Sequence, residues 1–389
     1  MTDAAETKGH AGEVLSAFAV LGCTSFGGPI AHLGYFRAEF VERRRWLTEE
    51  AYAELVALCQ FLPGPASSQV GFGLGWMRAG PLGALAAFLA FTLPSALLLV
   101  GVALGAQLFA GPVGAGVLDG LKLVAVAVVA QAVLGMARSL CPDRARASIA
   151  VVAVALIALL GAVGQIAAIA AGALAGLAFL SPEGQKAAPL EVRVAPALSI
   201  LALILFLVLL VGLPLLAPGS IADAFYRSGA LVFGGGHVVL PLLEAEVVGR
   251  GAVSEAEFLA GYGAAQAVPG PLFTFGAYLG TVMGGLTGAA IALAAIFLPG
   301  FLLLIGVLPF WTRLRAAPRA QAALAGANAA VVGVLGAALY DPVFTNAVQN
   351  PVEMTLALAG FVALVVWKAP ALGVVFALAT AGGLMGAFA

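Results

Sequence analysis

Two serines follow a helix-breaking motif inside an apolar stretch of the chain. Residues 63–65 read Pro-Gly-Pro, and Ser67 and Ser68 lie in the turn after them with Gln69 beside them. Because proline removes backbone donors and glycine permits unusual dihedral angles, one helix must end here and another can begin. The first amides of the new helix are free and carry the positive end of its dipole, which favours anions. Together with the two hydroxyls they suit the oxygens of a tetrahedral oxyanion. The alternative is a tight turn that packs two helices, with the serines bonded back to the helix.

The same motif returns later in the chain at residues 269–271. A glutamine precedes each copy, and its amide is a candidate hydrogen-bond donor to the same anion. A motif placed twice at matching points indicates a site and its symmetry mate. The predicted substrate-binding residues of the two copies are Gln60, Pro63, Gly64, Pro65, Ser67 and Ser68, with Gln266, Pro269, Gly270, Pro271 and Thr274.

Glycine-rich breaks form a second pair, and a histidine follows each of them. Residues 26–29 read Phe-Gly-Gly-Pro and precede His32, whereas residues 233–236 read Phe-Gly-Gly-Gly and precede His237. The glycines leave the backbone open to a ligand, and histidine titrates near neutral pH. We predict that the glycines contact the substrate and that the histidines are candidates for proton coupling. A polar residue at the membrane interface is the alternative for each histidine. The glycines concerned are Gly27, Gly28, Gly234 and Gly235.

Lys122 is the only cation inside an otherwise apolar segment. An ionisable residue within a membrane span is costly and is functional by default, so Lys122 is a candidate charge for binding the anion. The matching residue later in the chain is Asn328, which offers a neutral amide to the substrate instead. The alternative is that Lys122, near Asp119 and the end of its segment, reaches the membrane surface.

The composition shows that these elements lie in a lipid bilayer. The chain has 389 residues, of which 62% are hydrophobic and only 10% are charged, and its mean hydropathy is +1.08. A water-soluble domain has no use for so much apolar surface with so few charges. The net charge of −1 gives no argument for nucleic-acid binding. The three cysteines and three histidines lack metal-ligand spacing, so we predict no metal, no cofactor and no disulfide framework.

The apolar segments fall into two similar halves. Blocks match at an offset of 205 to 207 residues, from the glycine-rich breaks through the Pro-Gly-Pro motifs to Lys122 and Asn328. The pieces that flank each break are about 12–15 residues long, too short to cross about 30 Å of hydrocarbon, so we predict half-helices or re-entrant hairpins. We predict an N-terminal repeat at residues 1–180, a linker with one connecting span at 181–217 and a C-terminal repeat at 218–389.

Charge bias predicts that the two halves have inverted orientations. Residues 37–45 and 138–146 are rich in arginine, whereas the matching stretches of the second half carry one arginine or none. Residues 107–116 have no Lys or Arg, but their counterpart at residues 313–319 carries three arginines. By the positive-inside rule, this reversal places the N-terminus in the cytoplasm and the C-terminus outside. We predict nine full crossings and four re-entrant segments, with thirteen crossings as the alternative.

The motifs together resemble the chromate ion transporter family in its long two-domain form. The resemblance covers essentially the whole chain and rests on residues 26–29, Arg45-Trp46-Leu47, residues 60–65 and the second-half versions at 233–237 and 266–271. It implies an inner-membrane secondary transporter that exports chromate, a tetrahedral dianion similar to sulfate. Short members of the family work as pairs, which fits an internal duplication. The resemblance also implies site roles for Gly27, Gly28, Pro63, Gly64, Pro65 and their mates.

We therefore expect an all-α polytopic membrane protein with two inverted-topology homologous repeats and broken or re-entrant helices. The expected function is export of chromate across a bacterial inner membrane, driven by the membrane potential or the proton motive force, by a monomer or homodimer. Sulfate or another oxyanion is the alternative cargo, because sulfate has the same charge and shape. A membrane enzyme that reduces chromate through its thiols is a rival from another class, although the cysteines lack a resolving partner and no nucleotide or flavin motif occurs. A non-transporting structural subunit is a third reading.

Overall fold

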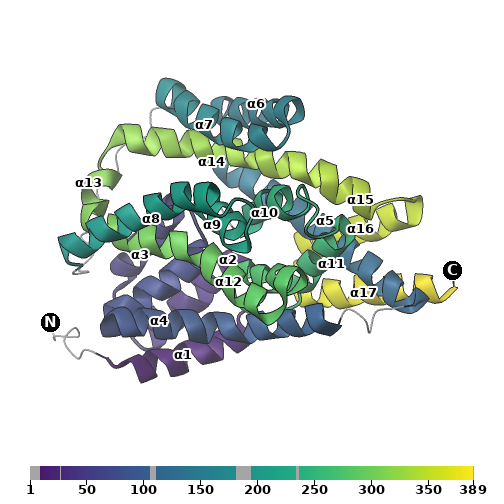
Figure 1. Ribbon diagram of the computed structural model, residues 1–389, viewed down its shortest axis with the longest axis horizontal. Coiled ribbons are helices and arrows are strands. Elements are labelled where there is room, and N and C mark those ends of the chain that lie inside the picture. The colour runs from purple at the N-terminus through teal and green to yellow at the C-terminus, as the bar shows by residue number, and fades with distance from the viewer. Residues whose placement is uncertain (1–8, 27, 106–110, 181–193, 234–235, 389) are drawn as a thin grey trace.

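The computed structural model describes residues 9–26, 28–105, 111–180, 194–233 and 236–388, and every regular element in these ranges is a helix. The expected all-α fold is therefore confirmed (Figure 1). The predicted contacts of Gly27, Gly234 and Gly235, and most of the predicted linker, lie outside the described residues.

The helices run in chain order, grouped by the predicted halves and connecting span. The first half contains α1 (Ala11–Thr24), α2 (Gly28–Phe36), the π-helix η1 (Arg37–Arg43), α3 (Glu49–Phe61), α4 (Ala66–Leu104), α5 (Pro112–Leu140), α6 (Arg144–Leu160) and α7 (Ala162–Phe179). The connecting helix is α8 (Pro196–Leu216). The second half contains α9 (Ile221–Leu231), η3 (Gly236–Val238), α10 (Val239–Val247), α11 (Glu255–Ala265), η4 (Leu272–Thr274), α12 (Phe275–Val307), η5 (Leu308–Phe310), α13 (Trp311–Arg315), α14 (Pro318–Ala338), η6 (Leu339–Phe344), α15 (Thr345–Ala347), α16 (Pro351–Val365) and α17 (Ala371–Phe388).

Long apolar helices dominate the described part of the chain. Six helical stretches there are long and apolar enough to cross a membrane: Ala66–Leu104, Pro112–Leu140, Pro196–Leu216, Leu272–Arg315, Pro318–Ala347 and Ala371–Phe388. Large apolar side chains also remain exposed along them, for example Leu207 and Leu215 of α8, as expected of a surface that faces lipid. The chain is a multi-pass membrane protein.

Helix α4 reverses direction within its length. Gly80 has a φ of 64° and leaves the helical dihedral angles. A Cβ atom on Gly75 would come within 2.4 Å of the carbonyl oxygen of Gly83, so these two glycines lie face to face. Residues 66–78 therefore fold back on residues 81–104 as a helical hairpin. Only glycine permits so close an approach of two backbones.

Helix α12 repeats this reversal at the matching place. Gly285 has a φ of 61°, and a Cβ atom on Gly280 would come within 2.4 Å of the carbonyl oxygen of Gly288. Residues 286–307 thus correspond to residues 81–104, and the short piece before Gly284 corresponds to residues 66–78. Each half contains one such hairpin directly after its Pro-Gly-Pro motif.

The broken segments of the first half enter and return to one end of the molecule. The indole Nε1 of Trp46, after η1, donates to the carboxylate of Glu13 near the start of α1 over 3.1 Å. Arg78, at the end of the 66–78 piece, forms an ion pair with the same carboxylate at 3.1 Å. Arg37 of η1 pairs with Glu49 at the start of α3 at 2.7 Å. The predicted re-entrant shape of both segments is present.

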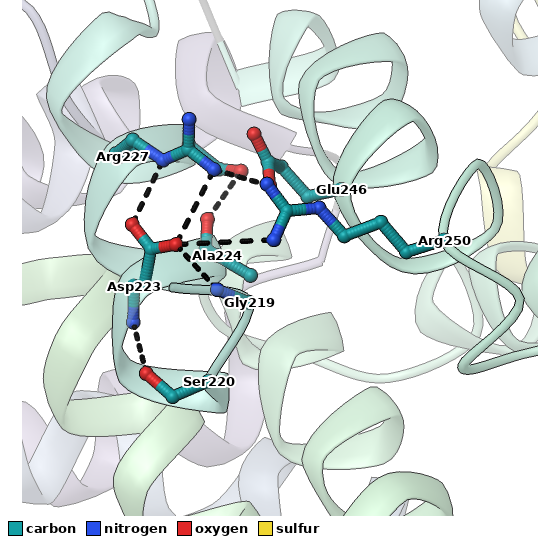
Figure 2. A network of polar contacts seen from close by, with 8 residues as sticks. Gly219, Ser220, Asp223, Ala224, Arg227, Glu246 and Arg250 are labelled. Atoms are coloured by element: carbon teal, nitrogen blue, oxygen red, sulfur yellow. Dashed lines mark hydrogen bonds and ion pairs between the residues drawn. The ribbon is translucent and has the colours of Figure 1, made fainter. Parts of the chain in front are cut away.

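An ion network holds the first broken segment of the second half in the same shape (Figure 2). Arg227 of α9 contacts Asp223 at 2.9 Å and Glu246 of α10 at 2.6 Å. Arg250, just after α10, contacts Glu246 at 2.9 Å. The start of α9 and the end of α10 therefore lie side by side, as α1 and η1 do in the first half.

The two halves exchange their last hairpins. Helix α5 packs against α16 and α17 of the second half, and α14 packs against α6 and α7 of the first. Gly116 lies against the carbonyl oxygen of Gly382, and Gly176 lies against that of Ala322. The two contacts are equivalent under the repeat. Gly116 corresponds to Ala322, and Gly176 corresponds to Gly382, at an offset of 206 residues. The exchange therefore relates the halves by an approximate twofold symmetry.

Candidate functional site

The breaks of the two halves meet through reciprocal backbone hydrogen bonds. The amide N–H of Gly64 donates to the carbonyl oxygen of Val232 over 2.7 Å, and the amide N–H of Gly270 donates to the carbonyl oxygen of Ser25 over 2.9 Å. Ser25 and Val232 are the matching residues that end α1 and α9. Each Pro-Gly-Pro motif is therefore bonded to the glycine-rich break of the opposite half.

Both central glycines have backbone conformations that side chains rarely adopt. The φ angle is 121° at Gly64 and 90° at Gly270. A Cβ atom on Gly64 would lie 3.0 Å from Cα of Gly300, and one on Gly270 would lie 2.9 Å from Oγ of Ser95. Gly300 and Ser95 follow the prolines inside the long helices of the opposite halves. The motifs thus pack against the proline-containing turns of those helices, again in a reciprocal pattern.

Polar side chains gather at the break of the first half. His32 is fully buried, and its Nε2 lies 3.2 Å from the carbonyl oxygen of Ser25. Since a carbonyl only accepts, Nε2 carries a proton, and the neutral ring then accepts at Nδ1 from Oγ of Ser67 at 3.4 Å. His32 therefore links the glycine-rich break to the start of α4, where the free helix amides lie.

Unpaired oxygens occur on the segments that meet at this link. Among the described residues, Ser25 Oγ, Ser68 Oγ, Thr92 Oγ1 and Gln69 Oε1 are buried and have no hydrogen-bond partner in the protein. Buried polar atoms are nearly always paired with protein or ordered water, so a cluster of such atoms indicates a place for a polar ligand or water. Hydroxyls and helix amides are neutral donors, and an oxyanion offers several acceptors to them.

The matching positions of the second half are apolar. Val232 replaces Ser25, Val239 replaces His32, Phe273 replaces Ser67 and Phe275 replaces Gln69, and these apolar residues are buried in the core. The retained hydroxyl, Thr274, donates to the carbonyl oxygen of Pro271 over 2.7 Å. The backbone of the two breaks is therefore symmetric, whereas the side-chain chemistry is concentrated in the first half.

The other predicted residues do not share the hydrogen bonds described above. His237 Nδ1 lies 2.6 Å from the hydroxyl of the buried Tyr262, and Gln266 donates to the carbonyl oxygen of Tyr262 at 3.4 Å. Gln60 is exposed. Lys122 forms an ion pair with Asp119 at 2.7 Å, and Asn328 Oδ1 is buried without a partner in the described structure.

Two cavities lie outside this site, and neither suits an anion. One, of about 310 Å³, is lined by apolar residues that include Phe61, Leu231 and Phe233. The other, of about 270 Å³, is lined by the carboxylates of Glu244 and Asp341, which would repel a negative ligand. The first-half break is therefore the better candidate for an anion site.

Three residues of the site were not predicted, namely Ser25, Thr92 and Ser95, whereas Gln69 belongs to the set predicted around the two serines. Ser25 directly precedes a predicted break, and Gln69 follows the predicted serines. Thr92 and Ser95 flank Pro94 inside a long apolar helix. The signal for the last two was a pair of hydroxyls within one turn of an intramembrane proline, where backbone groups are freed.

Comparison with known proteins identifies two stretches of similarity to one family. The family model described as "Chromate transporter" matches residues 12–177 and residues 219–387. These ranges fall on either side of α8. No solved structure matches the chain.

Curated relatives cover most of the chain. The "Chromate transport protein" of Pseudomonas aeruginosa is 31% identical over 380 residues, which is 92% of this chain and 87% of that protein. The "Probable chromate transport protein" of Synechococcus elongatus is 29% identical, covering 90% of this chain and 88% of that protein. The "Chromate transport protein" of Cupriavidus metallidurans is 27% identical, covering 84% and 81%.

Proposed function

This chain belongs to the chromate transporter family, and we propose that it exports chromate across a bacterial inner membrane as a secondary transporter. Members of the family are transporters and not enzymes. Cys23, Cys59 and Cys141 are all free thiols. Burial also raises the pKa of the Cys141 thiol, which lies between α5 and α6, and a raised pKa disfavours the reactive thiolate.

The observation that carries the proposal is the set of free donors at the first-half break. The first amides of α4 and the unpaired hydroxyls of Ser25, Ser68 and Thr92 belong to this buried region. The hydroxyl of Ser67 lies beside them and is bonded to His32. In this proposal chromate binds at the N-terminus of α4, and the donors replace part of its hydration shell. Lys122 would contribute charge only after leaving Asp119, so we assign it a secondary role.

We further propose that the halves are inverted in the membrane. Trp311, just beyond residues 286–307, donates to the carboxylate of Glu54 in α3 over 3.1 Å, and Arg315 pairs with the same group. Residues 286–307 would then end at the side where residues 81–104 begin. The charge bias of the loops supports the same arrangement, with the N-terminus in the cytoplasm and the C-terminus outside.

The element pattern supports nine crossings with four re-entrant segments. Apart from the pieces that flank the breaks, the described helices supply nine candidate crossings: residues 81–104 and 286–307, with α5, α6, α7, α8, α14, α16 and α17. Helices α6 and α16 are short for a span, so they would cross where the exchanged hairpins thin the hydrocarbon.

The membrane potential alone is enough to drive export. Moving two negative charges out of a negative-inside cell releases about 4–5 kcal/mol at 100 mV. Coupling to protons would add to this through His32, which contacts Ser67 at the site, or through His237.

Uptake of radiolabelled chromate into inverted membrane vesicles tests the proposal. Vesicles that contain the protein should accumulate chromate when an inside-positive potential is imposed, and vesicles without it should not. A protein that is correctly inserted but gives no gradient-dependent accumulation would refute chromate export.

A further inference from the structure

A buried ion pair joins the two halves of the chain. The guanidinium group of Arg315 in α13 pairs with the carboxylate of Glu54 in α3, and these side chains are only 15% and 9% exposed. The indole N–H of Trp311 donates to the same carboxylate over 3.1 Å, and the guanidinium group lies 5.7 Å from the centre of the Trp311 ring. Each half therefore supplies one charge of a buried pair at the boundary between them.

Trp311 also contacts α3 at a second point. Its ring meets the ring of Phe61 edge to face, with the ring centres 5.5 Å apart. Glu54 and Phe61 are separated by about two helical turns, so they lie on the same face of α3. Phe61 is the last residue of α3, and the Pro-Gly-Pro motif begins at Pro63. The second half thus holds α3 at two points, and the second point lies next to the break of the first half.

An apolar cavity borders Phe61. It has a volume of about 310 Å³ and lies between Phe61, α7 and α14, and its wall includes both chain neighbours of Val232. The carbonyl oxygen of Val232 accepts the hydrogen bond from the amide of Gly64. Because closely packed side chains can move only where space is free, the cavity gives Phe61 room to leave Trp311. A movement of Phe61 into this space would displace the neighbouring bond between Gly64 and Val232.

The contact has no counterpart in the other half of the repeat. Ala260 stands where Glu54 stands in the first half, and residues 105–110, which correspond to residues 311–315, include neither Trp nor Arg. Transporters with inverted repeats alternate access by moving one repeat against the other. A contact that exists on one side only stabilises one of the two conformations and not its symmetry mate.

We propose that Glu54, Trp311 and Arg315 form a latch that closes the transporter toward the cytoplasm and separates when chromate enters from that side. This inference rests on the proposed function and orientation. The latch lies beside the three arginines of residues 313–319, on the side that the positive-inside rule places in the cytoplasm. The loss of hydration on burying two charges offsets most of their attraction, so such a pair can separate once water reaches it.

The test measures initial rates of chromate uptake into inverted vesicles, whose outer surface is the cytoplasmic face. Glu54→Gln keeps an acceptor for Trp311 but removes the charge that holds Arg315. More of the protein should then be open to the cytoplasm, and KM for chromate should fall by about threefold or more, because apparent affinity rises with the competent fraction. The maximal rate per molecule should fall as well, since closing no longer forms the ion pair. Loss of a merely structural contact would lower the maximal rate and Tm without lowering KM.

Glu13 provides a matched control within one half. Its carboxylate accepts from the indole N–H of Trp46 over 3.1 Å and pairs with Arg78 at 3.1 Å. The guanidinium group of Arg78 lies 5.3 Å from the centre of the Trp46 ring. The same three residue types therefore meet here without joining the two halves. Glu13→Gln should leave KM for chromate unchanged.

The outcomes separate the latch from the proposed function. An unchanged or raised KM in Glu54→Gln, or an equal fall in Glu13→Gln, would overturn the inference and leave the proposed function standing. If Glu54→Gln does not fold, Arg315→Lys decides, because it keeps the charge and loses the planar contact with Trp311. Its KM should also fall, and an unchanged or raised value would overturn the inference. Absence of chromate uptake by the unmodified protein would refute the function itself.

Discussion

Gly64 donates its amide hydrogen to the carbonyl oxygen of Val232 over 2.7 Å, across the boundary between the two repeats. Its mate, Gly270, donates to Ser25 in the reverse sense. Each repeat therefore supplies a backbone hydrogen-bond partner to the break of the other. If the repeats move relative to each other, both bonds must change together. The movement that opens the site to one side of the membrane would therefore also change the geometry of the anion site.

Gly64→Ala should abolish most transport. An alanine at a φ of 121° is strained by about 1–3 kcal/mol, and its Cβ atom would meet Cα of Gly300 at 3.0 Å. Initial rates of chromate uptake measure the effect. Gly101→Ala is the control, because nothing lies within 4 Å of a Cβ atom there. Normal rates in Gly64→Ala would show that the break is only a turn.

The hydroxyls of the first half should matter more than the one retained in the second. Ser68→Ala removes an unpaired buried donor and should raise KM for chromate about tenfold to hundredfold, the value of a hydrogen bond to a charged group. Thr274→Val removes a hydroxyl already bonded to Pro271, and it should leave KM within about threefold of the unmodified protein after correction for expression. The reverse order of effects would contradict a one-sided site.

His32 should be the proton-coupling histidine. It contacts Ser67 at the site, whereas His237 is bonded to Tyr262. In vesicles clamped at zero membrane potential, His32→Gln should remove the stimulation of uptake by a pH gradient, because the side chain can no longer gain a proton. His237→Gln should keep it. Stimulation that survives in His32→Gln would exclude His32 as the coupling group.

The ion network of α9 and α10 should be essential for stability. Asp223 is buried and faces both Arg227 and Arg250 (Figure 2). Asp223→Ala leaves these two cations with Glu246 alone and should cost about 2–3 kcal/mol, seen as a lower Tm in detergent. Arg37→Ala removes exposed ion pairs with Glu42 and Glu49 and should change Tm little, because exposed ion pairs contribute little to stability. Equal Tm values for the two variants would show that the network is not structural.

The exchanged hairpins should depend on glycine. A Cβ atom on Gly326 would come within 2.1 Å of the carbonyl oxygen of Gly172, so Gly326→Ala must separate α14 from α7 and should lower Tm, with a cost of about 1–3 kcal/mol. Gly336→Ala, on the same helix, has nothing within 4 Å of the new atom and should raise Tm slightly, because alanine favours helix. The prediction is wrong if both variants have the Tm of the unmodified protein.

The sequence predicted the elements whose cause is local. Proline and glycine break helices wherever they stand, so the breaks at Gly64 and Gly270 were visible before the structure, and the repeat followed from their spacing. The exchange of hairpins was not visible, because small residues such as Gly326 permit close packing without specifying a partner. The one-sided chemistry was not predicted, because the two Pro-Gly-Pro motifs are identical and do not specify the side chains after them, where Gln69 corresponds to Phe275.

The most direct test of the central claim is a cryo-EM map of the protein with chromate bound. We predict density for one tetrahedral oxyanion at the N-terminus of α4, within hydrogen-bonding distance of Ser67 and Ser68, with no equivalent density beside Phe273. Density at the second-half break, or beside Lys122 away from these serines, would contradict the account.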